Sequence, residues 1–213
     1  MSRQKKRSIV VATANRGKLS EFIEILGAEH YTFFSLKEIG FDEEIDEAGE
    51  SFQANAEIKC RAVARYLQKH PELIARPLTV LSDDSGLLVD ALRGAPGIHT
   101  SRFAGPQATS HDNIAKMIEL LEGERNRKAH FHCTICQIDI DQNGNSSEPQ
   151  FSVGECHGTL ATAPRGKEGF GYDPLFIPDG ETRTFAEISS SEKKEYSHRG
   201  VALRQLRAKL KLA

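Results

Sequence analysis

Hydrophobic positions along the first half of the chain change from short apolar runs to helical spacings and back. The β-branched run SIVVA at residues 8–12 predicts a short buried strand. Apolar residues then recur at helical spacing between Leu19 and Leu26, and Gly27 can end this helix. A longer apolar stripe predicts an amphipathic helix over residues 51–68. Strand and helix signals therefore alternate.

Further along the chain, the pattern becomes richer in strands. Pro77 opens the segment LTVLSDDSG, which predicts a buried strand running into two acids and a glycine. Ser110 can cap a helix that Gly123 would stop, and residues 129–140 and 150–160 are typical of strands, with the turn signal DQNGN between them. LFIP follows a glycine-rich loop, and a last helix is expected from Val201. We expect a mixed α/β protein in which sheet and helices share one continuous core.

Composition excludes several classes of protein. The 213 residues (23.6 kDa) suit one large domain or a closely joined pair of lobes, and 38% hydrophobic with 27% charged residues is typical of a folded soluble chain. There is no apolar run of about 18 residues, so no membrane span is expected. A net charge of −2 argues against wrapping long nucleic acid.

The termini and cysteines suggest a cytoplasmic protein. The basic start MSRQKKRS lacks the apolar segment of a secretion signal, so residues 1–8 are expected to be a solvated tail before a domain over residues 9–213. Four cysteines without a signal peptide favour a reducing compartment. Cys133 and Cys136 form a CxxC motif with histidines nearby, so a zinc site has to be considered. An extended strand points them to opposite faces, so buried free thiols are the better interpretation.

The segment TANRGK, between the first predicted strand and helix, is a candidate phosphate-binding loop. A helix N-terminus offers free backbone N–H groups, Lys18 adds charge, and Thr13 and Asn15 add hydrogen bonds. The P-loop pattern fails, since Ala12 stands at its first glycine and Leu19 at its Ser/Thr. Taken alone, the segment favours a capped helix with an exposed lysine.

Two carboxylates follow the buried strand after Pro77. Asp83 and Asp84 are expected at its C-terminal end, where α/β sheets usually bind ligands. Successive strand residues face opposite sides, so only one would face a site unless the backbone turns at Ser85–Gly86. Further acids lie at Asp42, Glu43, Glu44, Asp46, Glu47 and Glu50, in a run typical of a solvated loop. Paired aspartates at a strand end indicate metal-assisted phosphate chemistry, because a hard ion such as Mg²⁺ needs a few carboxylates plus phosphate oxygens.

Three other segments offer ligand-binding groups. Asn55 and Lys59 are four residues apart on one helix face, although Lys59 could equally contact solvent or the vicinity of Glu57. GKEGFGYDP surrounds Phe170 with glycines and suits stacking on a flat ring. SEKKEYSHRG places several donors in a loop just before the final helix, which Ser197 can cap. Together the last two segments suit a base and an anion.

These segments together resemble a known family. TANRGKLSEF, SFQANAEIKCRA, LSDDSGLLVDALRGAPGIHTSRFAG, GFGYDPLF and SHRGVAL, in this order, resemble the inosine triphosphate pyrophosphatase family, and the match runs from about Ile9 to Leu210. The resemblance implies hydrolysis of non-standard purine nucleoside triphosphates (ITP, dITP, XTP) to the monophosphate and pyrophosphate. It also implies an elongated mixed β-sheet flanked by helices, two lobes with a central active-site cleft, a Mg²⁺ cofactor and a homodimer.

The resemblance also implies residue roles. Asp84 corresponds to the metal-binding catalytic base, Glu47 to a magnesium ligand, and Lys18 and Lys59 to lysines at the phosphates. The substrate-binding positions it implies are Thr13, Ala14, Asn15, Arg16, Gly17, Lys18, Ser85, Phe170, Gly171, Tyr172, Asp173, Lys193, His198 and Arg199. Three positions depart from the family pattern: Ala14 replaces Gly, Ala54 replaces Glu and Lys194 replaces Asn. The last bears on base preference.

Three rival functions stay open. A pyrophosphatase for other modified nucleotides would share the phosphate loop but differ in base preference. A non-catalytic nucleotide sensor would keep the loop and base pocket without the acids, whereas Glu47, Asp83 and Asp84 are all present. A zinc-bound interaction module is the third, and it depends on the CxxC segment.

Overall fold

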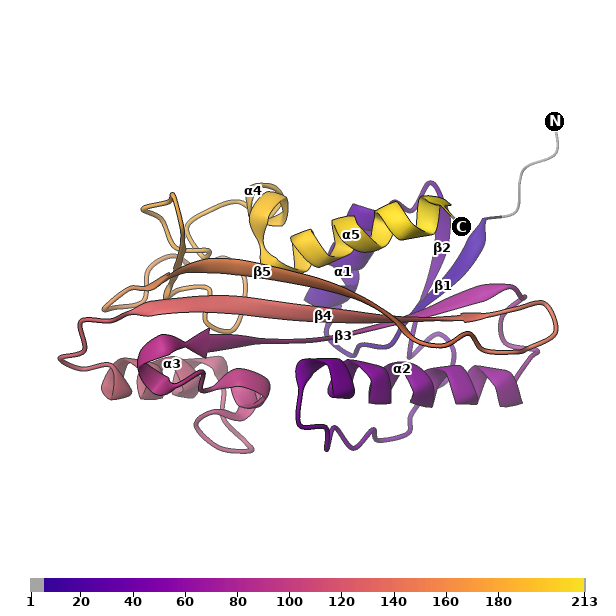
Figure 1. The fold of residues 1–213 in the computed structure, drawn as a ribbon, viewed down its shortest axis with the longest axis horizontal. Coiled ribbons are helices and arrows are strands. Elements are labelled where there is room, and N and C mark those ends of the chain that lie inside the picture. Colours follow the sequence, from indigo (N-terminus) through magenta and orange to yellow (C-terminus); the bar gives the residue numbers. More distant parts are fainter. Residues whose placement is uncertain (1–5, 213) are drawn as a thin grey trace. The chain divides into compact units, whose positions relative to one another are not determined.

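A computed structural model of the chain describes residues 6–212, and within them a mixed six-stranded sheet is flanked by helices (Figure 1). The sheet order is β2-β1-β3-β4-β5-β6; β1 pairs in parallel with β2 and β3, and β5 pairs antiparallel with β6. This confirms the predicted α/β class. The elements are β1 (Arg7–Val11), α1 (Arg16–Leu26), β2 (Tyr31–Ser35), α2 (Phe52–Lys69), β3 (Leu78–Val89), α3 (Ser110–Leu120), β4 (Lys128–Ile140), β5 (Gln150–Leu160), β6 (Phe176–Pro178), α4 (Ser190–Tyr196) and α5 (His198–Leu212), with 3₁₀ turns at Asp90–Leu92 and Gly97–Arg102.

The chain divides into two compact units. Unit 1 extends to Asp84 and also contains Thr134–Ser152 and the chain from Ala202, whereas unit 2 contains Ser85–Cys133 and Val153–Val201. The chain therefore passes from one unit to the other within β3, β4, β5 and α5. Each unit has its own buried hydrophobic cluster, which corrects the expectation of one continuous core.

In unit 1, α2 lies on one side of the strands, and α1 and α5 lie on the other (Figure 1). The apolar stripe of α2 is fully buried at Ala56, Cys60 and Val63, and it packs with Val10 of β1 and Val80 of β3. Ser51 caps α2 by accepting the backbone N–H of Ala54 at 3.1 Å. This packing fixes the direction of α2 relative to β3, so residues on its polar face have defined positions.

In unit 2, α3 packs Ile114 and Met117 into a cluster that also contains Leu87 of β3 and Phe131 of β4. The N-cap of α3 is Thr109, one residue before the predicted cap, and it forms a reciprocal capping box with Asp112. The segment after β5 contributes further to this cluster through Phe176 and Phe185, which are fully buried.

Several expectations about the elements need correction. Residues 1–5 of the predicted tail lie outside the described chain. Arg7 and Ser8 belong to β1, because they pair with Tyr31 and Thr32 of β2. The expectation that Asp83 and Asp84 stand at the C-terminal end of their strand is wrong, since β3 continues without the possible turn at Ser85–Gly86 as far as Val89. The short strand β2 and helix α4 were not predicted. Within the described residues, no helix is long and apolar enough to cross a membrane.

Candidate active site

The loop between β1 and α1 is a capped helix start. Asn15 is the N-cap of α1, and its Oδ1 accepts the backbone N–H groups of Gly17 at 2.8 Å and Lys18 at 3.2 Å. The Thr13 hydroxyl accepts the N–H of Asn15 at 3.2 Å, while Ala14, Arg16 and Gly17 are exposed. The side-chain cap that the sequence suggested is therefore present, and it orients the positive end of α1 beside Lys18.

Lys18 is paired, not free. Its ammonium lies 2.9 Å from Oδ2 of Asp83, whose side chain is only 1% exposed. A buried carboxylate needs a cation or several hydrogen bonds to stay ionised. The pair therefore attaches the start of α1 to β3, and it corrects the picture of an exposed lysine.

The neighbouring carboxylate, Asp84, contacts a different lysine. Lys59 of α2 lies 3.5 Å from Oδ1 of Asp84 and 2.8 Å from Oε2 of Glu47, so one ammonium bridges two carboxylates. Glu57, the alternative partner considered for Lys59, instead pairs with Arg61 at 2.7 Å. Because side chains alternate along a strand, the straight course of β3 allows Asp83 and Asp84 to serve separate lysines.

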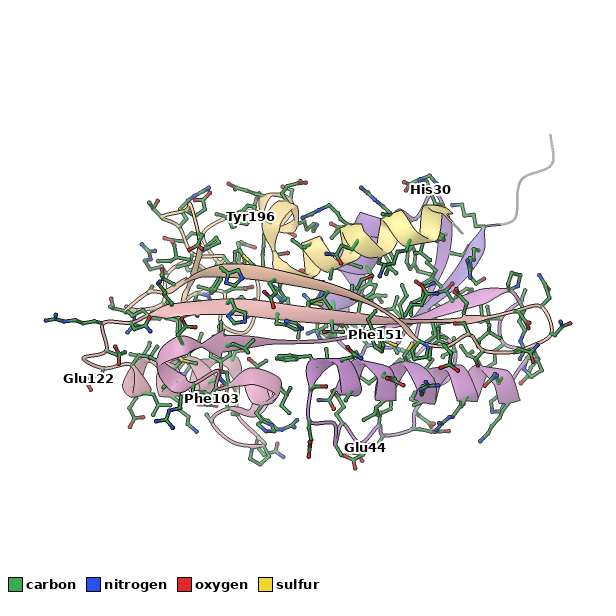
Figure 2. All side chains as sticks on the ribbon, in the orientation of Figure 1. His30, Glu44, Phe103, Glu122, Phe151 and Tyr196 are labelled. Carbon is green, nitrogen blue, oxygen red and sulfur yellow. The ribbon has the colours of Figure 1, made fainter. Side chains whose placement is uncertain are left out.

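Asn55 adds an amide to this arrangement. It is buried, its Nδ2 donates to Oδ2 of Asp84 at 3.4 Å, and its Oδ1 accepts the backbone N–H of Gly49 at 2.8 Å. A side chain at Gly49 would collide with the Asn55 amide. Asn55 therefore connects the acidic segment before α2 to Asp84, which explains how Glu47 comes to contact Lys59. Other acids of that segment are exposed, such as Glu44 in the connection between β2 and α2 (Figure 2).

We call Lys18, Glu47, Asn55, Lys59, Asp83 and Asp84 the lysine–carboxylate cluster, and all lie in unit 1. Burial raises the pKa of the Asp84 carboxyl, against the opposing charges of Lys59 and Lys18. Burial alone would lower the pKa of the Lys59 ammonium, but the charges of Asp84 and Asp83 and the hydrogen bond to Glu47 outweigh it, so its pKa is raised. A carboxylate with a raised pKa is a stronger proton acceptor.

The lysine–carboxylate cluster fits a divalent cation only with help from a ligand. Glu47 and Asp84 both approach the Lys59 ammonium, so their oxygens can share one cation. Among the described residues, no group of three or more His, Cys, Asp or Glu side chains is placed to hold a metal. Mg²⁺ commonly takes one or two carboxylates and completes its shell with water and phosphate oxygens, so this donor set suits it.

A second polar cluster lies in unit 2 around Asp173. One carboxylate oxygen of Asp173 accepts the ammonium of Lys193 at 2.6 Å and the backbone N–H of Phe170 at 2.8 Å. A side chain at Gly169 would collide with this carboxylate, and its φ of 78° also favours glycine. The GFGYD sequence is therefore explained locally by the close approach of Asp173.

Phe170 is exposed and carries two cations on its ring. It is 41% exposed, although large apolar side chains are usually buried. The Lys193 ammonium lies 5.2 Å from its ring centroid, and the Arg199 guanidinium carbon 5.9 Å. Arg199 is itself only 2% exposed and donates to the Ser85 hydroxyl at 3.0 Å. An open aromatic face next to oriented donors suits a flat heterocycle with carbonyl groups.

The donors of SEKKEYSHRG are on helices, whereas the sequence analysis placed them in a loop. Lys193 lies in α4, and His198 and Arg199 begin α5. Ser197 separates the two helices and accepts the backbone N–H of Gly200 at 3.2 Å, which confirms the predicted cap. A Cβ at position 200 would clash with the Lys194 carbonyl oxygen, so only glycine allows this tight junction.

Tyr172 is buried, in contrast to Phe170. It is 3% exposed, its hydroxyl donates to the Thr100 carbonyl at 3.2 Å, and burial raises its pKa. Its visible role is to attach the glycine-rich loop to the turn at Gly97–Arg102. We call Ser85, Phe170, Gly171, Tyr172, Asp173, Lys193, His198 and Arg199 the aromatic–cation cluster.

The residue list derived from the sequence omitted two members of the lysine–carboxylate cluster. Asp83 was considered with Asp84 as one of two paired carboxylates, of which only one was expected to face a site, and its pairing with Lys18 was not foreseen. Asn55 was noted on the Lys59 face, and its hydrophobic surroundings in α2 were the available signal for burial. Cys133 and Cys136 are buried thiols within the uninterrupted β4, as predicted, and Cys60 and Cys156 are also buried and form no disulfide.

The described residues thus form an α/β protein with a lysine–carboxylate cluster next to the start of α1 and a separate aromatic–cation cluster. The chain belongs to the Ham1 family, whose model matches residues 9–209. It is 41% identical over 202 residues to a dITP/XTP pyrophosphatase of Bacillus subtilis, covering 94% of this chain and 95% of the relative. Its fold is similar to the Ham1 protein of Staphylococcus aureus, with TM-score 0.82, 34% identity and coverage of 96% and 98%. It is also similar to a HAM1 protein from Coxiella burnetii, with TM-score 0.82, 39% identity and coverage of 97% and 100%.

Proposed function

We propose that the protein is a nucleoside-triphosphate pyrophosphatase that hydrolyses non-standard purine nucleotides (ITP, dITP, XTP). The observation that carries this proposal is Asp84, a carboxylate with a burial-raised pKa held 3.5 Å from the Lys59 ammonium. Support also comes from relatives named dITP/XTP pyrophosphatase at 41% and 40% identity, each covering over nine-tenths of both chains.

The reaction converts a nucleoside triphosphate and water into a monophosphate and pyrophosphate. A water oxygen attacks the α-phosphorus, the bond from that phosphorus to the bridging oxygen breaks, and pyrophosphate leaves with the bond electrons. Asp84 accepts the proton of the attacking water. Lys18 and Lys59 exchange part of their carboxylate contacts for phosphate oxygens and stabilise the charge that develops there. Thr13, Asn15 and the exposed residues Ala14, Arg16 and Gly17 line the start of α1, whose positive end favours an anion such as phosphate.

Glu47 and Asp84 would hold Mg²⁺. When bound, it neutralises phosphate charge and lowers the pKa of a coordinated water. The support is the shared approach of both carboxylates to one ammonium, together with the small number of carboxylates that Mg²⁺ requires. Ala54 leaves α2 without a further acid at that point, which is consistent with a site completed by substrate oxygens.

The base is selected by the aromatic–cation cluster. Phe170 supplies a stacking surface, and Asp173 holds both the Phe170 backbone and the Lys193 ammonium in place. Arg199, next to the Phe170 ring, and His198 supply hydrogen-bond donors to the base. Donors suit the 6-carbonyl of hypoxanthine or xanthine and oppose the 6-amino group of adenine. A buried donor left without a partner costs about 1–3 kcal/mol, which is roughly ten- to over a hundredfold per contact.

We also propose a cytoplasmic homodimer. The four free, buried cysteines are consistent with a reducing compartment, and the resemblance to the inosine triphosphate pyrophosphatase family suggests the dimer. Light scattering coupled to size-exclusion chromatography measures the mass in solution. A mass equal to one chain at micromolar concentration would contradict the dimer.

A magnesium-dependent hydrolysis panel tests the function. The purified protein is incubated with ITP, dITP, XTP, ATP, GTP and modified pyrimidine triphosphates, and pyrophosphate is measured separately from orthophosphate. We expect pyrophosphate from the 6-oxo substrates ITP and XTP and far less from ATP. Preferred hydrolysis of a modified pyrimidine triphosphate would support a pyrophosphatase for other modified nucleotides. Nucleotide binding without turnover would support a non-catalytic sensor. Stoichiometric zinc in the purified protein would support an interaction module.

A further inference from the structure

The imidazole of His198 lies flat against a phenylalanine outside the aromatic–cation cluster. The rings of Phe131 and His198 are 4.7 Å apart at their centroids and inclined by only 13°. Phe131 comes from β4 and His198 from the first residue of α5, so this contact joins two elements of unit 2 that are distant in sequence. Both side chains are buried, at 7% exposure each.

The backbone of His198 is already fixed by the junction between α4 and α5. The backbone N–H of Ser197 donates to the Lys193 carbonyl at 2.9 Å, and the Ser197 hydroxyl accepts the backbone N–H of Gly200 at 3.2 Å. Only the side-chain torsions of His198 remain to be set. The outer torsion of histidine is broad and roughly two-fold, so the plane of the ring needs a neighbour to define it.

Phe131 can define that plane because it is itself held on other sides. Its ring meets Phe176 edge-on at 4.8 Å and stacks on Phe185 at 6.1 Å. Phe185 in turn lies 5.0 Å beneath the Lys193 ammonium. We call Phe131, Phe176 and Phe185 the aromatic floor. It contacts two of the polar residues assigned to the base, His198 through Phe131 and Lys193 through Phe185.

We propose that Phe131 is a positioning residue for base selection, which holds the plane of the His198 imidazole so that its donor meets the substrate base. The proposal rests on the proposed function of the aromatic–cation cluster and adds a residue in β4 to it. Phe131 does not touch the base. It acts through His198. Because the His198 ring is already oriented, substrate binding costs less conformational entropy.

The test compares Phe131→Leu with Phe131→Tyr. Aromatic pairs contribute beyond their buried area, so loss of the stacked ring is expected to raise KM for ITP about two- to tenfold. The ratio of kcat/KM for ITP over ATP should fall by a similar factor, while kcat for ITP changes less. Phe131→Tyr keeps the ring and should retain the wild-type KM and ratio.

Met117→Ala is the matched control for lost packing. Met117 is fully buried in the same hydrophobic cluster, so this variant loses core contacts without losing the ring beneath His198. We expect a lower melting temperature with an unchanged ITP to ATP ratio. A Phe131→Leu protein with the same melting temperature as Met117→Ala and an unchanged ratio would overturn the proposal.

NMR spectroscopy of the unmodified protein gives a readout that does not depend on a variant folding. Protons of the His198 ring, assigned by through-bond experiments on the isotope-labelled wild-type protein, should be shifted upfield by the ring current of Phe131. Unshifted signals would overturn the stacking and the proposal with it. If the wild-type protein hydrolyses no nucleoside triphosphate, the proposed function fails first; if it hydrolyses ITP and Phe131→Leu behaves as Met117→Ala, only this inference fails.

Discussion

Asp83 and Asp84 are consecutive in β3, yet their carboxylates pair with lysines from different helices. Asp83 lies 2.9 Å from Lys18 of α1, and Asp84 lies 3.5 Å from Lys59 of α2. The alternation of an extended strand separates the two acids, so one can stabilise the fold while the other stays available for chemistry. Asp83 is the more buried of the two.

The Lys18–Asp83 pair gives a prediction about stability. Lys18→Met leaves the nearly inaccessible Asp83 carboxylate without its ammonium, which is expected to lower the free energy of unfolding by about 3 kcal/mol. Adding Asp83→Asn removes the stranded charge and should recover a large part of that loss. Urea denaturation of the three proteins measures both steps. Equal stability of the single and double variants would show that the ion pair is not what holds Asp83.

Asp84→Asn separates binding from chemistry. The amide keeps the size of the side chain but cannot accept the proton of water, so turnover is expected to fall about 10²- to 10⁴-fold. Nucleotide affinity, measured by calorimetry with ITP, should change little. Asp46→Asn, in the exposed acidic segment, is the matched control and should retain full activity. Wild-type rates in Asp84→Asn would remove this residue from the reaction.

The magnesium proposal is tested at Glu47. Glu47→Gln removes one of the two carboxylates proposed for the cation, so the Mg²⁺ concentration for half-maximal activity should rise several-fold. Excess EDTA should abolish activity in both proteins, and added Mg²⁺ should restore it. Glu44→Gln, at an exposed acid of the same segment, should keep the wild-type magnesium dependence. An identical dependence in Glu47→Gln would exclude it as a ligand.

Arg199 is predicted to discriminate between purines. Arg199→Ala removes a buried donor, so the preference for ITP over ATP should fall about tenfold or more. The measurement is the ratio of kcat/KM for the two substrates. Arg183→Ala, at an exposed arginine paired with Glu181 and Glu192, is the control and should leave the ratio unchanged. An unaltered ratio in Arg199→Ala would assign the discrimination to other residues.

His130 of β4 gives a prediction about acid stability. Burial lowers its pKa below the ordinary 6.5, and the nearby charge of His157 acts in the same direction, whereas Glu155 and Asp90 oppose it. The ring also stacks on His157 at 5.0 Å, and His132 lies nearby with its own bond to Glu155 at 3.1 Å. The folded chain therefore resists protonation at this position.

The unfolded chain takes up that proton at higher pH than the folded chain, so the contribution of His130 to the free energy of unfolding decreases as the pH falls below 6.5. His130→Gln should flatten this part of the stability curve, measured by urea denaturation between about pH 7 and pH 5.5. His111→Gln, at an exposed histidine of α3, should not. Parallel curves for wild type and His130→Gln would contradict the prediction.

Much of the fold could be predicted because its signals are local. The α2 helix was expected at residues 51–68 and spans Phe52–Lys69, because its apolar stripe has one periodicity from end to end. Strand β5 has the predicted bounds, since exposed and buried residues alternate along it. β2 was missed because its five residues are all partly exposed or exposed, so tertiary pairing with β1 decides its conformation.

The site was less accessible to prediction because it depends on pairings between distant residues. Composition and spacing alone could not show that Lys59 bridges Glu47 and Asp84, or that Asp173 binds both Lys193 and Phe170. The resemblance supplied the residues but not these contacts. Phe131 shows the limit most clearly, because a phenylalanine in an apolar strand has no sequence signal that separates it from ordinary core.

One carboxylate oxygen of Asp173 accepts two hydrogen bonds, and this has a consequence for how the protein can evolve. A single carboxylate oxygen secures both the loop bearing Phe170 and the ammonium of Lys193, and Gly169 leaves no room for a larger neighbour. A substitution at Asp173 disturbs the Phe170 loop and the Lys193 ammonium together, so neither can be changed there without the other. Changes of ligand preference among related proteins should therefore occur at Arg199, His198 or Phe131, while Asp173 is retained.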